Sequence, residues 1–394
     1  MSTAHLRELL DLLIRWVHLI AGIMWIGNSL LFNWLDRNLE RPAGSPEGFE
    51  GRIWMVHSGG FYDVVKKQLE PGQLPERLHW FKFQNLTTWV SGIFLLIVVY
   101  YLGGAALMLD PQVRALGPEA AVAIGAGAIV GAWIVYDLLC RVLIKESVLF
   151  GIVGFTFLGL LSYALTHFLS GRAAYIHVGV ILGTIMTGNV WMVIVPSQRE
   201  LIAATTEGRA QDPAIGKKAK QRSIHNNYMT FPLLFMMISN HFPSTYGQHL
   251  NWVVLIVLMV GGALVRHFMN IRFVYTGWFV GATVTILASV LALFVLTKPK
   301  AAAAPMPTVA FARAHEIVAK RCMPCHSDRP TDELFKVAPN NIKMDTPEQI
   351  RFLAPRIKER AYNLKTMPLA NRTQMTDEER AELAAWVDQG ASLQ

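Results

Sequence analysis

Residues 276–310, TGWFVGATVTILASVLALFVLTKPKAAAAPMPTVA, divide the chain into two parts of different character. The stretch begins apolar and, with the residues just before it, is long enough to cross a bilayer as a helix. Ala and Pro then dominate, a composition typical of a linker, which we place at residues 299–309. We therefore expect a membrane domain over 1–298 and a small soluble domain over 310–394.

The membrane domain is predicted from its apolar runs. Of 394 residues, 53% are hydrophobic and 16% are charged, and the mean hydropathy is +0.33, whereas soluble domains are about 25% charged. Because lipid offers no partner to backbone polar groups, each run is predicted to be a helix. Eight spans result, at residues 14–35, 84–104, 119–141, 147–169, 173–196, 224–241, 250–269 and 273–297. The expected fold class is all-α, a polytopic membrane bundle of eight transmembrane helices plus a small helical domain, although the sixth span starts polar and carries Pro232.

Loop charges predict the orientation of this bundle. Sixteen Lys and Arg residues fall in the first, third, fifth and seventh loops, against four on the opposite side. Basic loops stay in the cytoplasm, so both termini should face outward. We expect a multi-pass protein of the cell inner membrane with its C-terminal domain in the periplasm. The net charge of +8 is explained by these loops, so the predicted partner is the lipid bilayer and not nucleic acid.

The soluble domain carries CMPCH, in which Cys322, Cys325 and His326 form the motif C-x-x-C-H. This motif attaches haem c covalently: the two thiols add to the haem vinyl groups and the histidine becomes an iron ligand. An amphipathic helix runs into the motif, and capping boxes at Thr346 and Thr376 predict two more helices. A short helical domain around a haem indicates a class I cytochrome c.

The second ligand of the haem c iron should be a methionine or a histidine. We predict Met367, because the adjacent Pro368 stiffens the loop that must press the thioether onto the iron. Met375 and Met344 are the alternatives. Methionine raises the haem potential relative to histidine, so the domain should accept or carry electrons.

Two pairs of segments in the membrane domain suggest an internal repeat. VHLIAGIMWIGN (17–28) and IHVGVILGTIMTGN (176–189) both run from His through glycines and a Met to Gly-Asn. HWFKFQNLTTW (79–89) and HNNYMTFPLLF (225–235) both combine His, Asn and Thr at the start of a span. Copies of four spans each would share one orientation, related by an axis along the membrane normal.

The repeat would set His18 opposite His177 near the outer face, and His79 opposite His225 near the inner face. Ionisable residues at membrane depth are rare and usually functional. Paired imidazoles can ligate the iron of a b-type haem, so we expect one or two b-type haems, the first held by His18 and His177. The alternative is that these histidines only form hydrogen bonds between helices. Copper is not favoured, because Cys, Met and His do not cluster.

The chain resembles the membrane-bound urate oxidases (urate hydroxylases), in which an eight-span domain is fused to a C-terminal cytochrome c. The resemblance is carried by RWVHLIAGIMWIGNS (15–29), HNNYMTFPLLFMMISNHFP (225–243) and the terminal CMPCH with TMPLANRTQMTDEER, and it covers the whole chain. It implies an oxidoreductase of purine degradation that oxidises urate to 5-hydroxyisourate. The electrons would pass to its own haem c rather than to oxygen, and then to a downstream cytochrome c or terminal oxidase.

Urate is a planar anion, so oxidising it needs cationic and hydrogen-bonding groups and a base. The segment from 198 to 230 offers such groups at the start of a helix, where anions are favoured. The predicted catalytic residues are Arg199, His225, Asn226, Asn227, Tyr228 and Thr230. Two other classes of protein fit the same sequence: a quinol-linked electron-transfer protein without urate chemistry, and a transporter or sensor with a tethered cytochrome.

Overall fold

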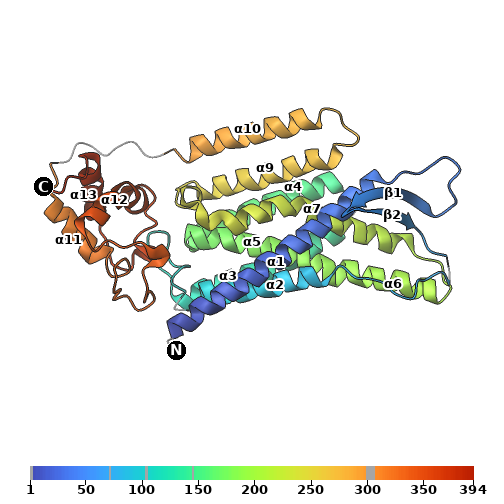
Figure 1. Ribbon diagram of the computed structural model, residues 1–394, viewed down its shortest axis with the longest axis horizontal. Coiled ribbons are helices and arrows are strands. Elements are labelled where there is room, and N and C mark those ends of the chain that lie inside the picture. The colour runs from blue at the N-terminus through green and yellow to red at the C-terminus, as the bar shows by residue number, and fades with distance from the viewer. Residues whose placement is uncertain (1–2, 71, 103–104, 144–145, 299–306) are drawn as a thin grey trace.

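The structure is a computed structural model that describes residues 3–70, 72–102, 105–143, 146–298 and 307–394. Most of the predicted linker, residues 299–306, therefore lies outside the described residues. Figure 1 shows a bundle of long helices with a smaller helical domain at one end, beside the N-terminus of the chain. We call this end of the bundle the domain end and the opposite end, which carries a β-hairpin, the hairpin end.

Long helical segments run along the bundle. They are α1 Thr3–Asn38, α2 Phe83–Leu95 with its π-helical extension η1 Leu96–Tyr101, α3 Pro118–Val142, α4 Ser147–Phe168, α5 Gly171–Asn189 continued by η2 Val190–Ile194 and α6 Val195–Thr206, α7 Pro213–Ile238, α9 Asn251–Ile271 and α10 Trp278–Leu296. Between α7 and α9 lie the short η3 Ser239–His241 and α8 Pro243–Tyr246. Within the described chain, seven segments are long and apolar enough to cross a membrane. They coincide with seven of the eight predicted spans.

Helix α7 occupies the position of the remaining predicted span, the sixth. It packs against α5 and α9, and Figure 1 shows it inside the bundle. Its polar residues Arg222, Asn226 and Asn227 are buried, so they face other helices and not lipid. Composition alone therefore does not identify α7 as a span.

A two-stranded antiparallel hairpin follows α1. Strand β1 Phe49–His57 pairs with β2 Gly60–Lys67 around Ser58 and Gly59, whose φ angles of 51° and 76° suit a two-residue hairpin turn. The all-α prediction is wrong for this segment. The stretch RIWMVHSGGFYDVVKK combines strand-forming residues with a Ser-Gly-Gly turn, a pattern that specifies a hairpin and that the sequence analysis treated as a loop.

The C-terminal domain consists of short helices around its own apolar core. Its elements are α11 Phe311–Arg321, η4 Pro339–Asn341, α12 Pro347–Ile357, η5 Lys358–Asn363, η6 Leu369–Asn371 and α13 Asp377–Asp388. Both predicted capping boxes form, at the starts of α12 and α13. Ile317, Ile350, Leu383 and Trp386 are nearly inaccessible to solvent and belong to one cluster that joins α11, α12 and α13.

One segment of this domain lies against the bundle. A Cβ added to Gly247 would lie 3.0 Å from Cγ2 of Thr366 and 3.1 Å from Cβ of Leu364, so the two parts meet closely there. In addition, Ala370 and Arg372 help to line a cavity of about 490 Å³ with residues of the segment 106–116 that leads to α3. The segment 364–372, which contains Met367, therefore faces the bundle.

Candidate functional site

A cavity of about 970 Å³ opens at the hairpin end of the bundle. Its wall is formed by α1 and α7, by η2 and α6, and by the segment 66–82 that leads from the hairpin to α2. The volume is at the upper end of the range for small-molecule sites. Aromatic residues include Trp25, Phe32, Trp80 and Phe81, and polar residues include Asn28, Asn33, His79, Gln198, Ser223 and Asn227.

The charged residues of the cavity wall balance in number: the lysines are Lys66, Lys67 and Lys82, and the carboxylates are Asp36, Glu50 and Asp212. Lys66 forms ion pairs with both Asp36 at 2.8 Å and Glu50 at 3.0 Å, so its charge is compensated inside the wall. Lys82 has no carboxylate partner within the described chain; its Nζ lies 4.2 Å from the ring centroid of Trp80. A flat ligand with negative charge would therefore meet both a cation and aromatic surfaces in this wall.

Asn227 of α7 connects the cavity wall to a buried polar cluster behind it. Its Oδ1 accepts hydrogen bonds from Arg266 Nε at 2.9 Å and from Asn270 Nδ2 at 2.7 Å, both on α9. The three side chains are at most 4% exposed. The α7–α9 contact thus holds a polar cluster directly behind the cavity.

The structure separates the predicted catalytic residues. His225 points toward α3 and α4, where its Nδ1 lies 2.9 Å from the Tyr136 hydroxyl and its ring stacks on Phe150. Tyr228 contacts His267 at 2.8 Å, and Arg199 is exposed on α6. None of these three lines the cavity.

The other predicted residues of α7, Asn226, Asn227 and Thr230, also point to different surroundings. Asn226 donates to Met186 O and accepts from Asn189, and the Thr230 hydroxyl donates to Asn226 O. Of the predicted set only Asn227 lines the cavity. The structure does not bring the six side chains together, because successive residues of a helix point about 100° apart and a continuous polar string cannot all face one site.

Asn189 lies at the centre of a second buried network. Its Nδ2 donates to the Tyr136 hydroxyl and to Asn226, both at 2.8 Å, and its Oδ1 accepts from Arg222 at 3.0 Å. Arg222 also forms an ion pair with Asp137 at 2.7 Å. Every one of these groups has a protein partner, so we assign the network a structural role.

The histidine pairs expected for b-type haem are not formed. Nδ1 of His18 lies 2.9 Å from Thr88 O on α2, whereas His177 contacts Ala173 O at 2.8 Å and the Tyr101 hydroxyl at 3.1 Å. Both ring nitrogens of His177 are thus occupied, and its ring fills the space above Gly125 of α3.

The second predicted pair is also separated. His79 lines the cavity, while His225 stacks on Phe150 of α4. The side chains therefore do not fit a bis-histidine haem at either predicted position. The repeat aligned sequence strings, but the helices that carry them turn their histidines toward different neighbours.

The C-x-x-C-H motif lies in the turn that follows α11, and its histidine fits an iron ligand. Nδ1 of His326 is 3.1 Å from Ile342 O. A ligating histidine typically donates one ring N–H to a carbonyl, which fixes the ring and leaves the other nitrogen for the metal. Burial raises the pKa of the Cys322 thiol to about 12 and that of Cys325 to about 11. The donor set is thus compatible with covalently bound haem.

Met367 differs in position from its two alternatives. Met344 and Met375 belong to the apolar core of the domain, whereas Met367 lies outside that core in the segment that faces the bundle. Its backbone is fixed at both ends: its N–H donates to Arg360 O at 3.0 Å, and its carbonyl accepts from Arg380 Nη1 at 2.6 Å. Met367 stays the predicted second ligand of haem c.

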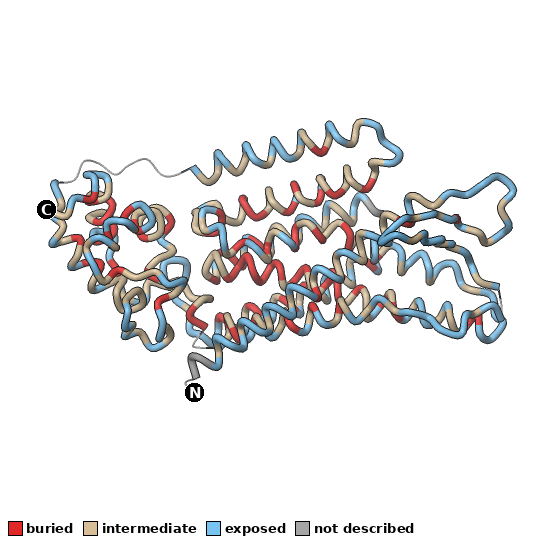
Figure 2. Tube along the Cα trace, viewed as in Figure 1, coloured by how far each residue is buried: buried red, intermediate tan, exposed pale blue. Residues whose placement is uncertain are grey.

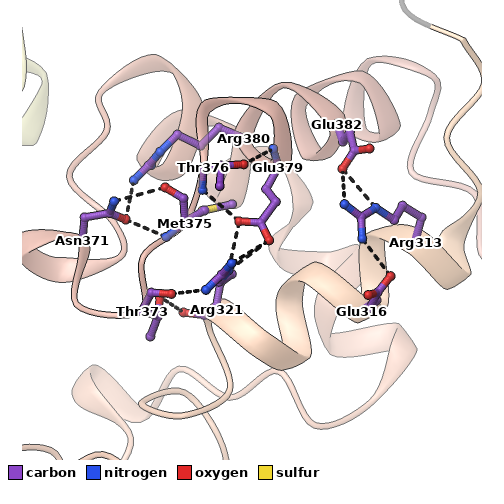
Figure 3. A network of polar contacts seen from close by, with 10 residues as sticks. All are labelled: Arg313, Glu316, Arg321, Asn371, Thr373, Met375, Thr376, Glu379, Arg380 and Glu382. Atoms are coloured by element: carbon purple, nitrogen blue, oxygen red, sulfur yellow. Dashed lines mark hydrogen bonds and ion pairs between the residues drawn. The ribbon is translucent and has the colours of Figure 1, made fainter.

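Figure 3 shows the polar network that supports this loop. Arg380 also donates to Asn371 Oδ1 at 3.1 Å, and Asn371 in turn bonds both the N–H and the carbonyl of Met375. Arg321 holds the Glu379 carboxylate at 2.9 Å. These contacts tie the start of α13 to the loop before it.

The chain thus combines a bundle with helices long and apolar enough to cross a membrane, a cavity of the size of a small-molecule site, and an attached C-x-x-C-H domain. The sequence model described as urate oxidase N-terminal matches residues 4–297. The chain therefore belongs to the urate oxidase N-terminal family, which confirms the resemblance for the bundle, whereas residues 310–394 lie outside the match. No curated protein and no solved structure matches the chain.

Sequence reasoning missed most of the cavity. His79 was predicted as a haem ligand, and Lys82, Asn28 and Gln198 were not predicted at all. Their signal was weak, because these four residues come from three separate segments that only the tertiary structure brings together. The basic segment before α2 was interpreted as a topology signal alone.

Proposed function

We propose that this protein is a membrane-bound urate oxidase that converts urate to 5-hydroxyisourate in the cavity of the bundle and passes the electrons to its own haem c. The observation that carries the proposal is the position of the cavity. All its lining residues lie between Trp25 and Asn227, inside the range 4–297 that defines the family. The whole cavity thus lies in the part of the chain that the family model matches, which supports the proposal.

The chemistry of the cavity suits this substrate. In the reaction one water adds its oxygen to C5 of urate, and two electrons and two protons are released. Trp80 and Phe81 offer aromatic surfaces to the planar ring, Lys82 offers a positive charge to the anion, and Asn227 an amide. His79 is the histidine of the wall, and imidazole is the side chain suited to accept a proton near neutral pH. We assign His79 as the base that takes the proton of the attacking water.

Haem c, held by Cys322, Cys325 and His326 with Met367 as the second ligand, would accept the two electrons one at a time and pass each to a downstream cytochrome c or terminal oxidase. The segment that contains Met367 is the part of the C-terminal domain that lies against the bundle, which favours transfer between the two parts. Because the oxidant is haem and the inserted oxygen comes from water, the reaction needs no molecular oxygen and releases no peroxide.

The cavity and the C-terminal domain lie at opposite ends of the bundle (Figure 1). A hydrocarbon core is about 30 Å thick, too far for a single electron-transfer step. The proposal therefore requires a redox relay between them. A pyridine haemochrome spectrum, which counts b-type and c-type haem separately, shows whether a second haem serves as this relay.

Two histidine variants test where the reaction takes place. His79→Gln should lower the rate of urate oxidation about 100-fold or more, the usual contribution of a general base. His225→Gln is the matched control: it lies in the same half of the bundle but outside the cavity, so turnover per covalent haem should change little. Loss of activity in His225→Gln with normal activity in His79→Gln would contradict the cavity assignment.

We also propose that the protein lies in the inner membrane with the C-terminal domain in the periplasm. A reporter that is active only in the periplasm should work when fused after Gln394 and fail when inserted within residues 205–215. The opposite pattern would reverse the orientation inferred from the loop charges.

A further inference from the structure

Two arginines are buried within the described part of the bundle, and their partners differ. Arg222 is 2% exposed and donates to Asp137 Oδ1 at 2.7 Å and to Asn189 at 3.0 Å. Arg266 is 3% exposed and forms no ion pair with any described carboxylate. Its Nε donates to the neutral Asn227. Arg222 is thus neutralised inside the protein and Arg266 is not.

The surroundings of Arg266 increase this excess of positive charge. The charged side chains that interact with it electrostatically, Arg272 and Arg37, are both cations. A buried guanidinium without a counter-charge is costly, and an ionisable group at membrane depth usually serves a function. The missing negative charge is therefore expected from a ligand.

Asn227 connects this charge to the cavity in one orientation only. Its Oδ1 accepts from Arg266 and from Asn270. A guanidinium has no acceptor, so the oxygen must face Arg266 and the amide cannot be reversed. No described residue accepts a hydrogen bond from Asn227 Nδ2, and Asn227 lines the cavity. Its N–H groups are thus left for a ligand.

We infer that Arg266 and Asn270 are positioning residues that fix Asn227 as a hydrogen-bond donor to a planar anion in the cavity. This inference rests on the proposed function, in which the anion is urate. The Arg266 charge polarises the amide and strengthens its donation, because hydrogen bonds in a chain reinforce one another at low dielectric. A ligand that presents an N–H at this point would meet another N–H and be rejected.

Asn227→Asp separates recognition of the ligand from support of the fold. The carboxylate has nearly the same shape and still accepts from Arg266 and Asn270, so the variant gains an ion pair. It loses the donor and places a negative charge beside the anion. The dissociation constant for urate, measured by anaerobic calorimetry on the full chain, should rise about 100-fold or more, while the thermal midpoint should not fall.

Variants of Arg266 test the positioning role itself. Arg266→Gln removes the charge. The new amide can either donate or accept a hydrogen bond, so the side-chain amide of Asn227 is free to rotate by 180°. The KM of this variant for urate should rise about tenfold, with a smaller change in kcat. Arg266→Lys keeps a charge and a donor, so it should restore most of the affinity. A residue that served only the fold would lower stability in both variants without this split between KM and kcat.

Asn226→Asp is the matched control on the neighbouring position. Asn226 does not line the cavity, and its Nδ2 donates to Met186 O at 3.0 Å. The variant should lower the thermal midpoint and leave the urate dissociation constant of the folded protein unchanged. If the wild type binds urate and Asn227→Asp binds it equally well, the inference is wrong and the proposed function stands. If the wild type neither binds nor oxidises urate, both are wrong.

Discussion

The bundle and the C-terminal domain differ in the side chains that they expose and in the make-up of their interiors. In the bundle, large apolar side chains such as Leu160 and Phe294 are exposed on the surface, and Asn189, Arg222 and Arg266 are buried. In the C-terminal domain, one apolar cluster joins the helices, and the buried charged side chains are Glu379 and Arg380. Figure 2 shows the buried residues of the bundle on the faces that its helices turn toward one another. A lipid-facing surface leaves the interior free for polar groups, whereas a small domain in water depends on an apolar core.

The largest expected effect is on the haem motif, whose loss should alter the C-terminal domain and leave the bundle in the membrane. Cys322→Ala combined with Cys325→Ala removes both thioether donors, so all covalent haem should be lost while the bundle still inserts into the membrane. Haem staining on a denaturing gel measures this directly. Staining that persists would mean that the covalent haem is not attached at this motif.

Removing a buried partner of a carboxylate in the bundle should destabilise the fold more than removing an exposed partner of the same carboxylate. Asp137 pairs with Arg222, whose side chain is 3% exposed, and with Arg141, whose side chain is 71% exposed. Arg222→Ala should lower the free energy of unfolding by about 3 kcal/mol, the lower end for a broken buried pair, since Arg141 remains. Arg141→Ala should cost about 0.2–1 kcal/mol.

Thermal unfolding in detergent measures both arginine variants. Equal losses of stability would show that the interior of the bundle is solvated, and the contrast drawn above would not hold.

Met367→His should keep the covalent haem of the C-terminal domain and lower its potential, because imidazole replaces a thioether. Axial ligands span about 0.8 V of haem potential, so the shift is measurable by redox titration. An unchanged potential would indicate Met375 or Met344 as the second ligand. The variant should leave urate binding in the bundle unaffected.

The smallest expected effect concerns Glu379 in the C-terminal domain. Burial alone would raise the pKa of its carboxyl, but hydrogen bonds donated by Arg321 and by the backbone N–H of Thr376 lower the pKa overall. A lowered folded-state pKa means that the carboxylate stabilises the fold above the unfolded value of about 4.3. This stability is lost as the pH falls through the lower, folded-state value.

Thermal unfolding followed at the haem absorbance should therefore show a loss of about 1.5–3 kcal/mol on acidification, the contribution of a charge-assisted hydrogen bond. Glu379→Gln should lack that part of the pH dependence. Asp377→Asn alters a carboxylate that is 72% exposed and should change the profile by less than about 1 kcal/mol. The same acid loss in Glu379→Gln as in the wild type would contradict this assignment.

The sequence was sufficient for those features that depend on local pattern. Seven of the eight spans predicted from apolar runs coincide with segments able to cross a membrane, and Thr346 and Thr376 predicted helix starts that the structure confirms. The side-chain groupings failed where they needed the direction of each residue on its helix. His225 and Asn227 are two residues apart, yet one faces Phe150 and the other lines the cavity. His79 and Lys82 reach the cavity from a segment outside the helices, for which no periodic pattern exists.

The central claim is that urate oxidised in the bundle reduces the haem of the C-terminal domain, and anaerobic reduction of the purified full chain tests it most directly. The account predicts that urate, added without oxygen to the oxidised protein, produces the absorbance bands of ferrous haem c, and that His79→Gln slows this about 100-fold. Ferrous bands that form with a quinol but not with urate would contradict the account and favour a quinol-linked electron-transfer protein.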